Sequence, residues 1–255
     1  MNKIGLVLSG GGARCFAHLG LLKVLDELNI NPFAISGVSA GAIVGALYAA
    51  GKKPDEILDL SKSNSFFSFS NLLWRKGGLF SMEPIHKLLN EHIPDDSFES
   101  LKIPLFVNAT DFTHNKTIFF SEGKLIECLI ASASVPVLFS PVEHDNKIMV
   151  DGGLLNNLPI EPLMGICDKI IGMHVNKLED LISTDLKLSK LAITERCFHI
   201  SIANSVYLKA AQCDLFIEPE LNNFGMFDVK QAENIFEIGY NTTMKQKDQL
   251  IEMLT

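Results

Sequence analysis

Short apolar runs and helical periods alternate along the first sixty residues. Lys3–Ser9 is a short apolar run that ends in glycines, as expected for a buried strand followed by a loop. Over Phe16–Leu28 the apolar residues recur every three positions, which is typical of a helix. A second strand is predicted over Pro32–Ser36, and helices over Ala40–Ala50 and Pro54–Ser61. This alternation predicts βαβ units and a parallel sheet.

The remainder of the chain continues the pattern less regularly. Ser63–Phe80 is rich in serine and phenylalanine and is predicted to be a long loop or broken helix. Long helical segments are expected over Leu186–Gln212 and Val229–Leu254. The other predicted elements are helices over Met82–His92 and Lys124–Ala133, and strands over Leu105–Ala109, Thr117–Phe120, Lys147–Val150, Lys169–Val175 and Leu215–Glu218. No repeat or linker interrupts the chain, so we expect one α/β domain over residues 1–255.

The composition is that of an ordinary globular protein, with 47% hydrophobic and 20% charged residues. A net charge of -8 argues against a nucleic-acid partner and against strong attraction to anionic lipid. The first residues lack the apolar length of a signal peptide, and the longest apolar stretch, Ala40–Ala50, is too short to span a bilayer. We therefore expect a cytoplasmic location, with peripheral contact to a membrane left open.

The cysteines are odd in number and scattered, and no two form a C-x-x-C pair. Five reduced thiols are expected, which agrees with a cytoplasmic protein. They are Cys15, Cys128, Cys167, Cys197 and Cys213. Neither these residues nor the histidines form a cluster with the spacing of a metal site, so no metal and no cofactor is expected.

The sequence Gly37-Val38-Ser39-Ala40-Gly41 lies between a predicted strand and a helix of small residues. This context favours a nucleophile elbow at Ser39, in which flanking glycines relieve crowding, although a helix-capping serine is the alternative. Only 38 residues precede Ser39, too few for the strands that an α/β-hydrolase places before its nucleophile. His174 and His199 lie in a strand and a helical stretch, where structural roles fit better than that of a triad base.

A glycine run, Gly10-Gly11-Gly12, follows the first predicted strand. Its backbone N–H groups can bind an anion, either a phosphate or a developing oxyanion. A dinucleotide is disfavoured because Cys15 occupies the place of the third glycine of the fingerprint, and no P-loop lysine follows. Loops after neighbouring parallel strands lie at one sheet edge, so this run and Ser39 can share a site. A plain glycine turn is the alternative.

Asp151 follows the predicted strand Lys147–Val150 and precedes Gly152 and Gly153. A carboxylate at a strand end can accept a hydrogen bond from a serine hydroxyl, or it can simply cap a turn. The spacing alone does not separate these two roles.

Four blocks taken together resemble the patatin-like phospholipases, close to the small bacterial members, which share their core with cytosolic phospholipase A2. The blocks are Gly10-Gly11-Gly12-Ala13-Arg14, Gly37-Val38-Ser39-Ala40-Gly41, Ala131-Ser132-Ala133-Ser134-Val135-Pro136 and Asp151-Gly152-Gly153, with Asn108-Ala109-Thr110-Asp111 as a further similarity. The resemblance implies a three-layer α/β/α fold with a mostly parallel central sheet. It also implies a Ser39–Asp151 dyad without histidine, and an oxyanion hole formed by Gly10, Gly11 and Gly12 with Arg14 on the adjoining loop. The implied activity is metal-independent hydrolysis of acyl esters of phospholipids or lysophospholipids through an acyl-enzyme.

Two segments stand apart from this resemblance. Cys15 replaces a glycine that the family usually has, either as a tolerated substitution or as a thiol whose pKa is lowered near a helix N-terminus. The apolar segment Phe66–Trp74 is interpreted as a membrane-surface contact, as part of an acyl channel, or as an ordinary core or subunit contact. Acidic residues such as Asp59, Glu83 and Asp111 are expected to be surface charges.

Two other functions are compatible with the sequence. An acyltransferase on a related fold usually has histidine beside the nucleophile, where this chain has Val38. A non-catalytic lipid-binding protein would carry a damaged dyad or glycine loop, whereas both are intact here except at Cys15.

Overall fold

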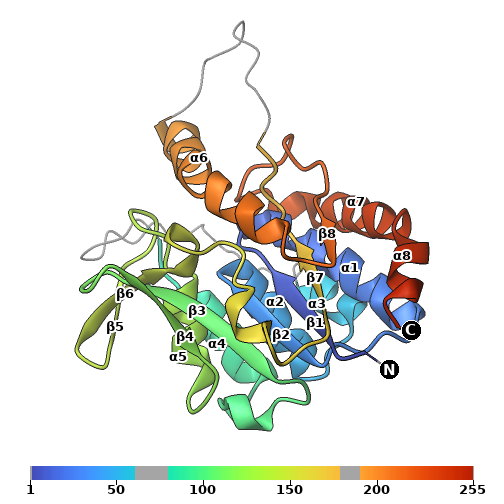
Figure 1. The fold of residues 1–255 in the computed structure, drawn as a ribbon. Coiled ribbons are helices and arrows are strands. Elements are labelled where there is room, and N and C mark those ends of the chain that lie inside the picture. The colour runs from blue at the N-terminus through green and yellow to red at the C-terminus, as the bar shows by residue number, and fades with distance from the viewer. Residues whose placement is uncertain (1, 61–79, 179–189, 255) are drawn as a thin grey trace, which may run out of the picture.

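One mixed sheet organises the protein (Figure 1). The computed structural model describes residues 2–60, 80–178 and 190–254. In this part of the chain the strand order is β5-β6-β3-β2-β1-β7-β8, and β4 also pairs with β3. The strands are β1 (Ile4–Leu8), β2 (Ala34–Val38), β3 (Leu105–Asp111), β4 (Lys116–Phe120), β5 (Val142–His144), β6 (Lys147–Asp151), β7 (Lys169–Met173) and β8 (Leu215–Ile217).

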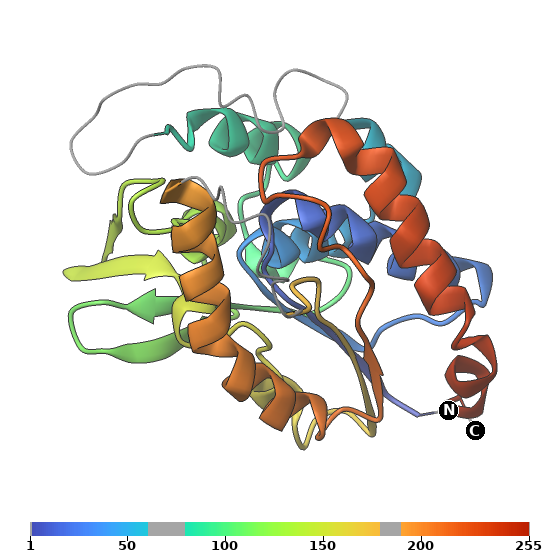
Figure 2. The same ribbon diagram turned by 90° about the horizontal axis from the view of Figure 1, so that it is seen from above.

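Helices cover both faces of this sheet. Figure 2 shows α6 on one side of the strands, and α1 and α7 on the other. The helices are α1 (Phe16–Glu27), α2 (Ala40–Ala49), α3 (Pro54–Leu60), α4 (Glu83–His92), α5 (Leu125–Ser132), α6 (Lys190–Ala210), α7 (Ala232–Met244) and α8 (Lys247–Glu252). Short 3-10 turns are η1 (Gly12–Cys15), η2 (Phe98–Ser100), η3 (Gly152–Leu154), η4 (Glu161–Leu163) and η5 (Val229–Gln231). The predicted three-layer architecture is confirmed.

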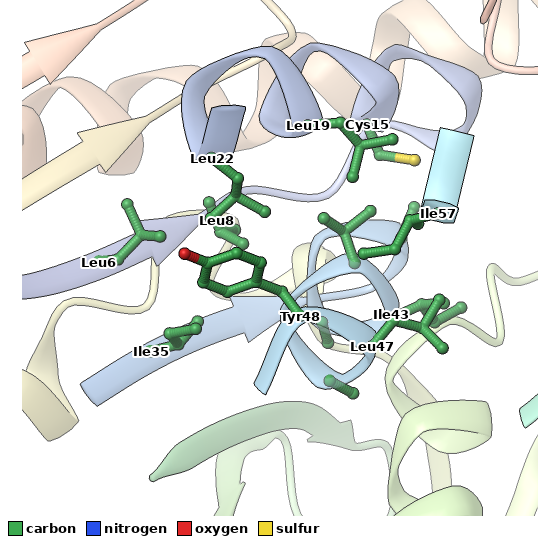
Figure 3. Packing of buried hydrophobic residues seen from close by; sticks show 14 of the residues in the cluster. Leu6, Leu8, Cys15, Leu19, Leu22, Ile35, Ile43, Leu47, Tyr48 and Ile57 are labelled. Atoms are coloured by element: carbon green, nitrogen blue, oxygen red, sulfur yellow. The ribbon is translucent and has the colours of Figure 1, made fainter. Parts of the chain in front are cut away.

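Strand β1 contributes side chains to a core on each face of the sheet. Its side chains alternate, so that Leu6 and Leu8 enter the larger core while Val7 enters the smaller one on the other face. In the larger core, residues of α1 and α2 pack over β1 and β2 (Figure 3). Every residue of β1 and β2 is buried, and all but Ser36 are apolar or glycine, which is typical of strands covered on both faces in a parallel sheet.

The strand register brings distant segments to one level. β1, β2 and β3 are parallel, and Val38 of β2 pairs with Asn108 of β3. β6 runs antiparallel to β3 and pairs Asp151 with Ala109, one position beyond Asn108. Ser39, directly after β2, and Asp151, at the end of β6, therefore lie at nearly the same level on either side of β3.

The predicted elements are largely confirmed, although several of their bounds shift by a few residues. The second strand begins at Ala34 and continues to Val38, two residues later than predicted. The expected C-terminal helix is broken near Lys245 and Gln246, so that α7 and α8 are separate. β5 was not predicted. The segment Phe66–Trp74 lies outside the described residues, so its role stays a prediction.

Asp111 was wrongly expected to be a surface charge. It ends β3 and is fully buried, and it accepts hydrogen bonds from the backbone N–H of His114 and from the ring nitrogen Nδ1 of His114. A buried carboxylate is stable when such donors compensate for lost water. In the described parts of the chain, every helix is too short or too polar to cross a membrane.

Candidate active site

The turn at Ser39 has the geometry of a nucleophile elbow. Ser39 adopts φ 54° and ψ −131°, a strained conformation for a residue with a side chain, and its carbonyl oxygen accepts the first hydrogen bonds of α2. Its N–H donates to Ser132 Oγ at 2.8 Å. Close packing needs the flanking glycines, because a Cβ at Gly41 would lie 2.3 Å from the Ser9 carbonyl oxygen and one at Gly37 would lie 2.7 Å from Ala42 Cα.

The Ser39 hydroxyl donates to Asp151 Oδ2 at 2.6 Å. The other carboxylate oxygen, Oδ1, accepts from the Gly153 N–H at 2.7 Å. Burial raises the pKa of Asp151 to about 6, although the hydrogen bonds from Ser39 and Gly153 oppose that shift. The structure therefore holds a carboxylate with an unusually high pKa directly on a serine hydroxyl.

The backbone around Asp151 is fixed on two sides. Its N–H donates to the Ser134 carbonyl oxygen at 2.9 Å, and its own carbonyl oxygen accepts from Thr110 Oγ1 at 3.0 Å. Gly152 then passes so close to β3 that a Cβ there would lie 2.3 Å from the Asn108 carbonyl oxygen. These contacts explain why glycine follows the aspartate.

The glycine loop packs directly against this pair. A Cβ at Gly10 would lie 3.0 Å from the Ser39 Cβ, so the two segments are in contact. The Gly10 N–H donates to Asn157 Oδ1 at 3.1 Å, and the Gly10 carbonyl oxygen accepts from Asn176 Nδ2 at 2.6 Å. The N–H groups of Gly11 and Gly12 have no acceptor among the described residues. Two of the three predicted oxyanion donors are thus available to a ligand, whereas Gly10 already has an acceptor.

The guanidinium group of Arg14 donates hydrogen bonds to two protein oxygens. Its Nε donates to the Phe224 carbonyl oxygen at 2.8 Å and its Nη1 donates to Asn176 Oδ1 at 3.0 Å. Asn176 therefore lies between Arg14 and the glycine loop.

The glycine loop, Ser39 and Asp151 line one pocket, part of which is open to solvent. Polar groups lie at one end: the glycine loop, Ser39, Asp151, Asn157 and Asn176. The other lining side chains are mostly apolar: Ala40, Ile43, Met82, Ile85, Ala133, Val135, Leu138, Phe139, Met226 and Phe227. A polar end beside an apolar cavity suits a ligand with a reactive polar group and a hydrocarbon part.

The two histidines considered as bases lie in different surroundings. His174 is buried and its Nδ1 lies 2.8 Å from Glu218 Oε1, which supports a structural role. His199 of α6 lines the pocket, and burial, with the nearby Arg14 charge, lowers its pKa to about 3, so it is neutral at physiological pH. The Ser39 hydroxyl donates instead to the carboxylate of Asp151. In the parts of the chain that the structure describes, no three His, Cys, Asp or Glu side chains are arranged to hold a metal ion.

Cys15 belongs to the hydrophobic core and not to the pocket wall. Its φ of −58° suits any residue, and its side chain packs near Leu19 and Ile57 (Figure 3). Burial raises the pKa of the thiol to about 12. The structure therefore contradicts a lowered pKa at Cys15 and supports a tolerated substitution.

Sequence reasoning assigned no role to three residues of this site: Ser132, Asn157 and Asn176. Ser132 lies in a block that was noted only for its resemblance to the family. Asn176 follows directly on the predicted strand Lys169–Val175, and a polar residue at the end of a buried parallel strand is a usable signal. Asn157 gave no comparable signal.

Solved structures of bacterial proteins share this fold. VipD of Legionella pneumophila matches 98% of this chain and 67% of its own, with a TM-score of 0.58 and 18% identity. A chain of the ExoU–SpcU complex of Pseudomonas aeruginosa matches all of this chain and 53% of its own, with a TM-score of 0.57 and 13% identity. At these identities the likeness supports the fold alone.

Sequence comparison adds the family. An uncharacterised NTE-family protein of Mycobacterium bovis is 33% identical over 181 residues, covering 69% of this chain and 50% of its own. Lysophospholipase NTE1 of Cryptococcus neoformans is 33% identical over 194 residues, covering 70% of this chain and 12% of its own. This chain thus spans half or less of the length of these relatives. The family model described as patatin-like phospholipase matches residues 6–164, and this protein belongs to that family.

Proposed function

We propose that this protein is a serine hydrolase that cleaves acyl esters of lipids, of the phospholipase A or lysophospholipase type, and that residues 1–255 form one patatin-like phospholipase domain. The observation that carries the proposal is the 2.6 Å hydrogen bond from Ser39 Oγ to Asp151 Oδ2 at the polar end of an apolar pocket. The name of the fungal relative, a lysophospholipase, supports the substrate class.

In the proposed reaction, Ser39 Oγ attacks the ester carbonyl carbon while its proton passes to Asp151 Oδ2. The carbonyl oxygen becomes negatively charged and is stabilised by the N–H groups of Gly11 and Gly12. When this intermediate collapses, the carbon–oxygen bond to the leaving alcohol breaks, and the alcohol takes the proton from Asp151. An acyl-enzyme on Ser39 remains.

Water then completes the cycle. The water oxygen attacks the acyl carbon while Asp151 accepts a proton from that water. The proton passes to Ser39 Oγ when the bond between Ser39 Oγ and the acyl carbon breaks and the fatty acid leaves. An aspartate with an ordinary pKa is a weak base, and the raised pKa of Asp151 brings it nearer to the pH at which the reaction runs. Each step uses residues of this chain and requires no metal.

The experiment is labelling with a fluorophosphonate probe, with peptide mapping, beside release of fatty acid from lysophosphatidylcholine. We expect labelling at Ser39 and a loss of about 10⁴-fold in kcat for Ser39→Ala and for Asp151→Ala. Ser36→Ala is the matched control, because Ser36 is a buried serine of β2 whose hydroxyl has no hydrogen-bond partner among the described residues. Full activity in Ser39→Ala would refute the proposal. Labelling that survives in Asp151→Ala but disappears in His199→Ala or His174→Ala would replace the dyad by a triad.

A further inference from the structure

Gly10 is held by hydrogen bonds on both of its peptide groups. Asn157 Oδ1 accepts from its N–H at 3.1 Å, and Asn176 Nδ2 donates to its carbonyl oxygen at 2.6 Å. Ser9 Oγ also donates to this carbonyl oxygen, at 3.2 Å. A glycine has no side chain to restrict its backbone, so these bonds determine how the loop is oriented.

The carbonyl oxygen of Gly10 and the N–H of Gly11 belong to the same peptide plane. In a trans peptide these two groups point to opposite sides. Fixing the carbonyl oxygen against Asn176 therefore fixes the direction of the Gly11 N–H, away from Asn176. Gly11 lines the pocket, and its N–H has no acceptor among the described residues.

The amide of Asn176 can take only one orientation. A guanidinium group only donates hydrogen bonds and a backbone carbonyl oxygen only accepts them. Arg14 Nη1 therefore requires Oδ1, and the Gly10 carbonyl oxygen requires Nδ2, as the structure has them. Arg14 is in turn bonded through Nε to the Phe224 carbonyl oxygen. Arg14, Asn176 and the Gly10 carbonyl oxygen thus form a continuous chain of hydrogen bonds.

We propose that Asn176 is a positioning residue of the oxyanion hole: held by Arg14, it orients the Gly10–Gly11 peptide so that the Gly11 N–H faces the negatively charged oxygen of the reaction. The inference rests on the proposed function. It assigns Arg14 an indirect role, acting on the glycine loop through Asn176 instead of touching the substrate.

Two substitutions at one position separate positioning from simple packing. Asn176→Ala removes both hydrogen bonds. Asn176→Asp keeps the volume and the acceptor for Arg14 but places a second acceptor against the Gly10 carbonyl oxygen. We expect kcat for lysophosphatidylcholine to fall about 30- to 100-fold in both variants, with KM changed less than about threefold, because loss of an oxyanion donor costs about 10²- to 10³-fold. A role only as a partner of Arg14 would leave Asn176→Asp near wild-type kcat and overturn the proposal.

Asn156→Ala is the matched control. Asn156 is a buried asparagine whose side chain bonds to Glu161 and Lys209, and among the described residues it makes no hydrogen bond to the glycine loop. We expect its kcat to stay within about threefold of wild type. An equal loss in Asn156→Ala would mean that any buried asparagine in this region lowers kcat through stability, which also overturns the proposal.

A double variant tests the role of Arg14. If Arg14 acts through Asn176, adding Arg14→Met to Asn176→Ala lowers kcat less than about threefold further, although Arg14→Met alone lowers it at least tenfold. If the kcat losses of the two single variants multiply in the double variant, Arg14 acts independently of Asn176, and its proposed indirect role is overturned. Ser39→Ala, measured in the same series, separates the two claims. If Ser39→Ala stays active, the proposed function fails, whereas wild-type kcat in Asn176→Asp with an inactive Ser39→Ala refutes only the positioning role.

Discussion

Replacing Asp151 by asparagine is expected to stabilise the protein while abolishing its activity. Asp151 is 2% exposed, and burial raises its pKa from 3.8 to about 6. Asparagine has nearly the same shape. Its oxygen can accept from the Gly153 N–H, and its NH₂ group can donate to Ser39 Oγ, so both contacts of the carboxylate keep a partner. The substitution therefore removes the buried negative charge and keeps the shape and contacts of the side chain.

Proton linkage gives the sign and size of this change in the free energy of unfolding. The folded state holds the Asp151 proton more tightly than the unfolded chain, so the wild-type free energy of unfolding falls as pH rises from about 4 to about 6. A difference of about two pKa units corresponds to about 3 kcal/mol, and about half of it falls between pH 5 and pH 8. Because asparagine does not titrate, the stability of Asp151→Asn relative to wild type should rise over this range.

Urea unfolding of both proteins at pH 5, 6, 7 and 8 measures this difference, and the pH dependence of all other groups cancels. Asp214→Asn is the control. Burial alone would raise the pKa of Asp214, but its hydrogen bonds with Lys169 and with the Ile170 N–H outweigh burial and lower the pKa. Asp214 is ionised in both states above pH 5, so its difference should stay constant. A difference for Asp151→Asn that is equally constant would refute the raised pKa and, with it, the account of Asp151 as a base matched to near-neutral pH.

Three further outcomes are expected. On the proposed mechanism only ionised Asp151 accepts the serine proton, so kcat/KM should rise about tenfold from pH 5 to a plateau, with a midpoint near pH 6; a midpoint near pH 4 would contradict this. Ser132→Ala leaves the buried Ser39 N–H without its acceptor, which should cost about 1–3 kcal/mol in urea unfolding and lower kcat about tenfold. Ser134→Ala is its control and should retain kcat, because among the described residues the Ser134 hydroxyl bonds only to the Ile130 carbonyl oxygen. Cys15→Ala should cost about 1 kcal/mol of stability and leave kcat unchanged, and in the native protein a thiol reagent with mass mapping should label the exposed Cys197 but not Cys15.

The sequence predicts the Ser39 turn and the glycine loop at one sheet edge because a single physical rule suffices. Both follow parallel strands, and the carboxyl ends of parallel strands meet at one edge. Glycines on either side of Ser39 then indicate how closely the backbones approach. These features depend on local sequence and on strand direction, which the alternation of strand and helix determines.

The positions of Asp151, Asn157 and Asn176 in the site depend on how distant segments are aligned with one another. The hydrophobic pattern does not encode that alignment. β6 runs antiparallel to β3, and its pairing places Asp151 at the level of Ser39. A short apolar run such as the one within Lys147–Val150 has the same appearance in either direction and at any offset. The role proposed for Asp151 therefore came from the family resemblance, and the hydrogen bonds of Asn157 and Asn176 to Gly10 were found only in the structure.

The same burial that weakens the fold at Asp151 is what makes a serine–aspartate pair chemically reasonable. A solvated aspartate with a pKa near 4 holds a proton too weakly to take one from a serine hydroxyl efficiently near neutral pH. Burial of the carboxylate away from water raises its pKa to about 6, near that of an unperturbed histidine, even though the hydrogen bonds from Ser39 and Gly153 oppose the shift. On the proposed mechanism, burial thus gives Asp151 a pKa that suits the general base, the role that an imidazole has in a catalytic triad. If so, a substitution that admits water beside Asp151 should lower the pKa and the activity together while stabilising the fold, a combination that neither a packing defect nor a lost substrate contact would produce.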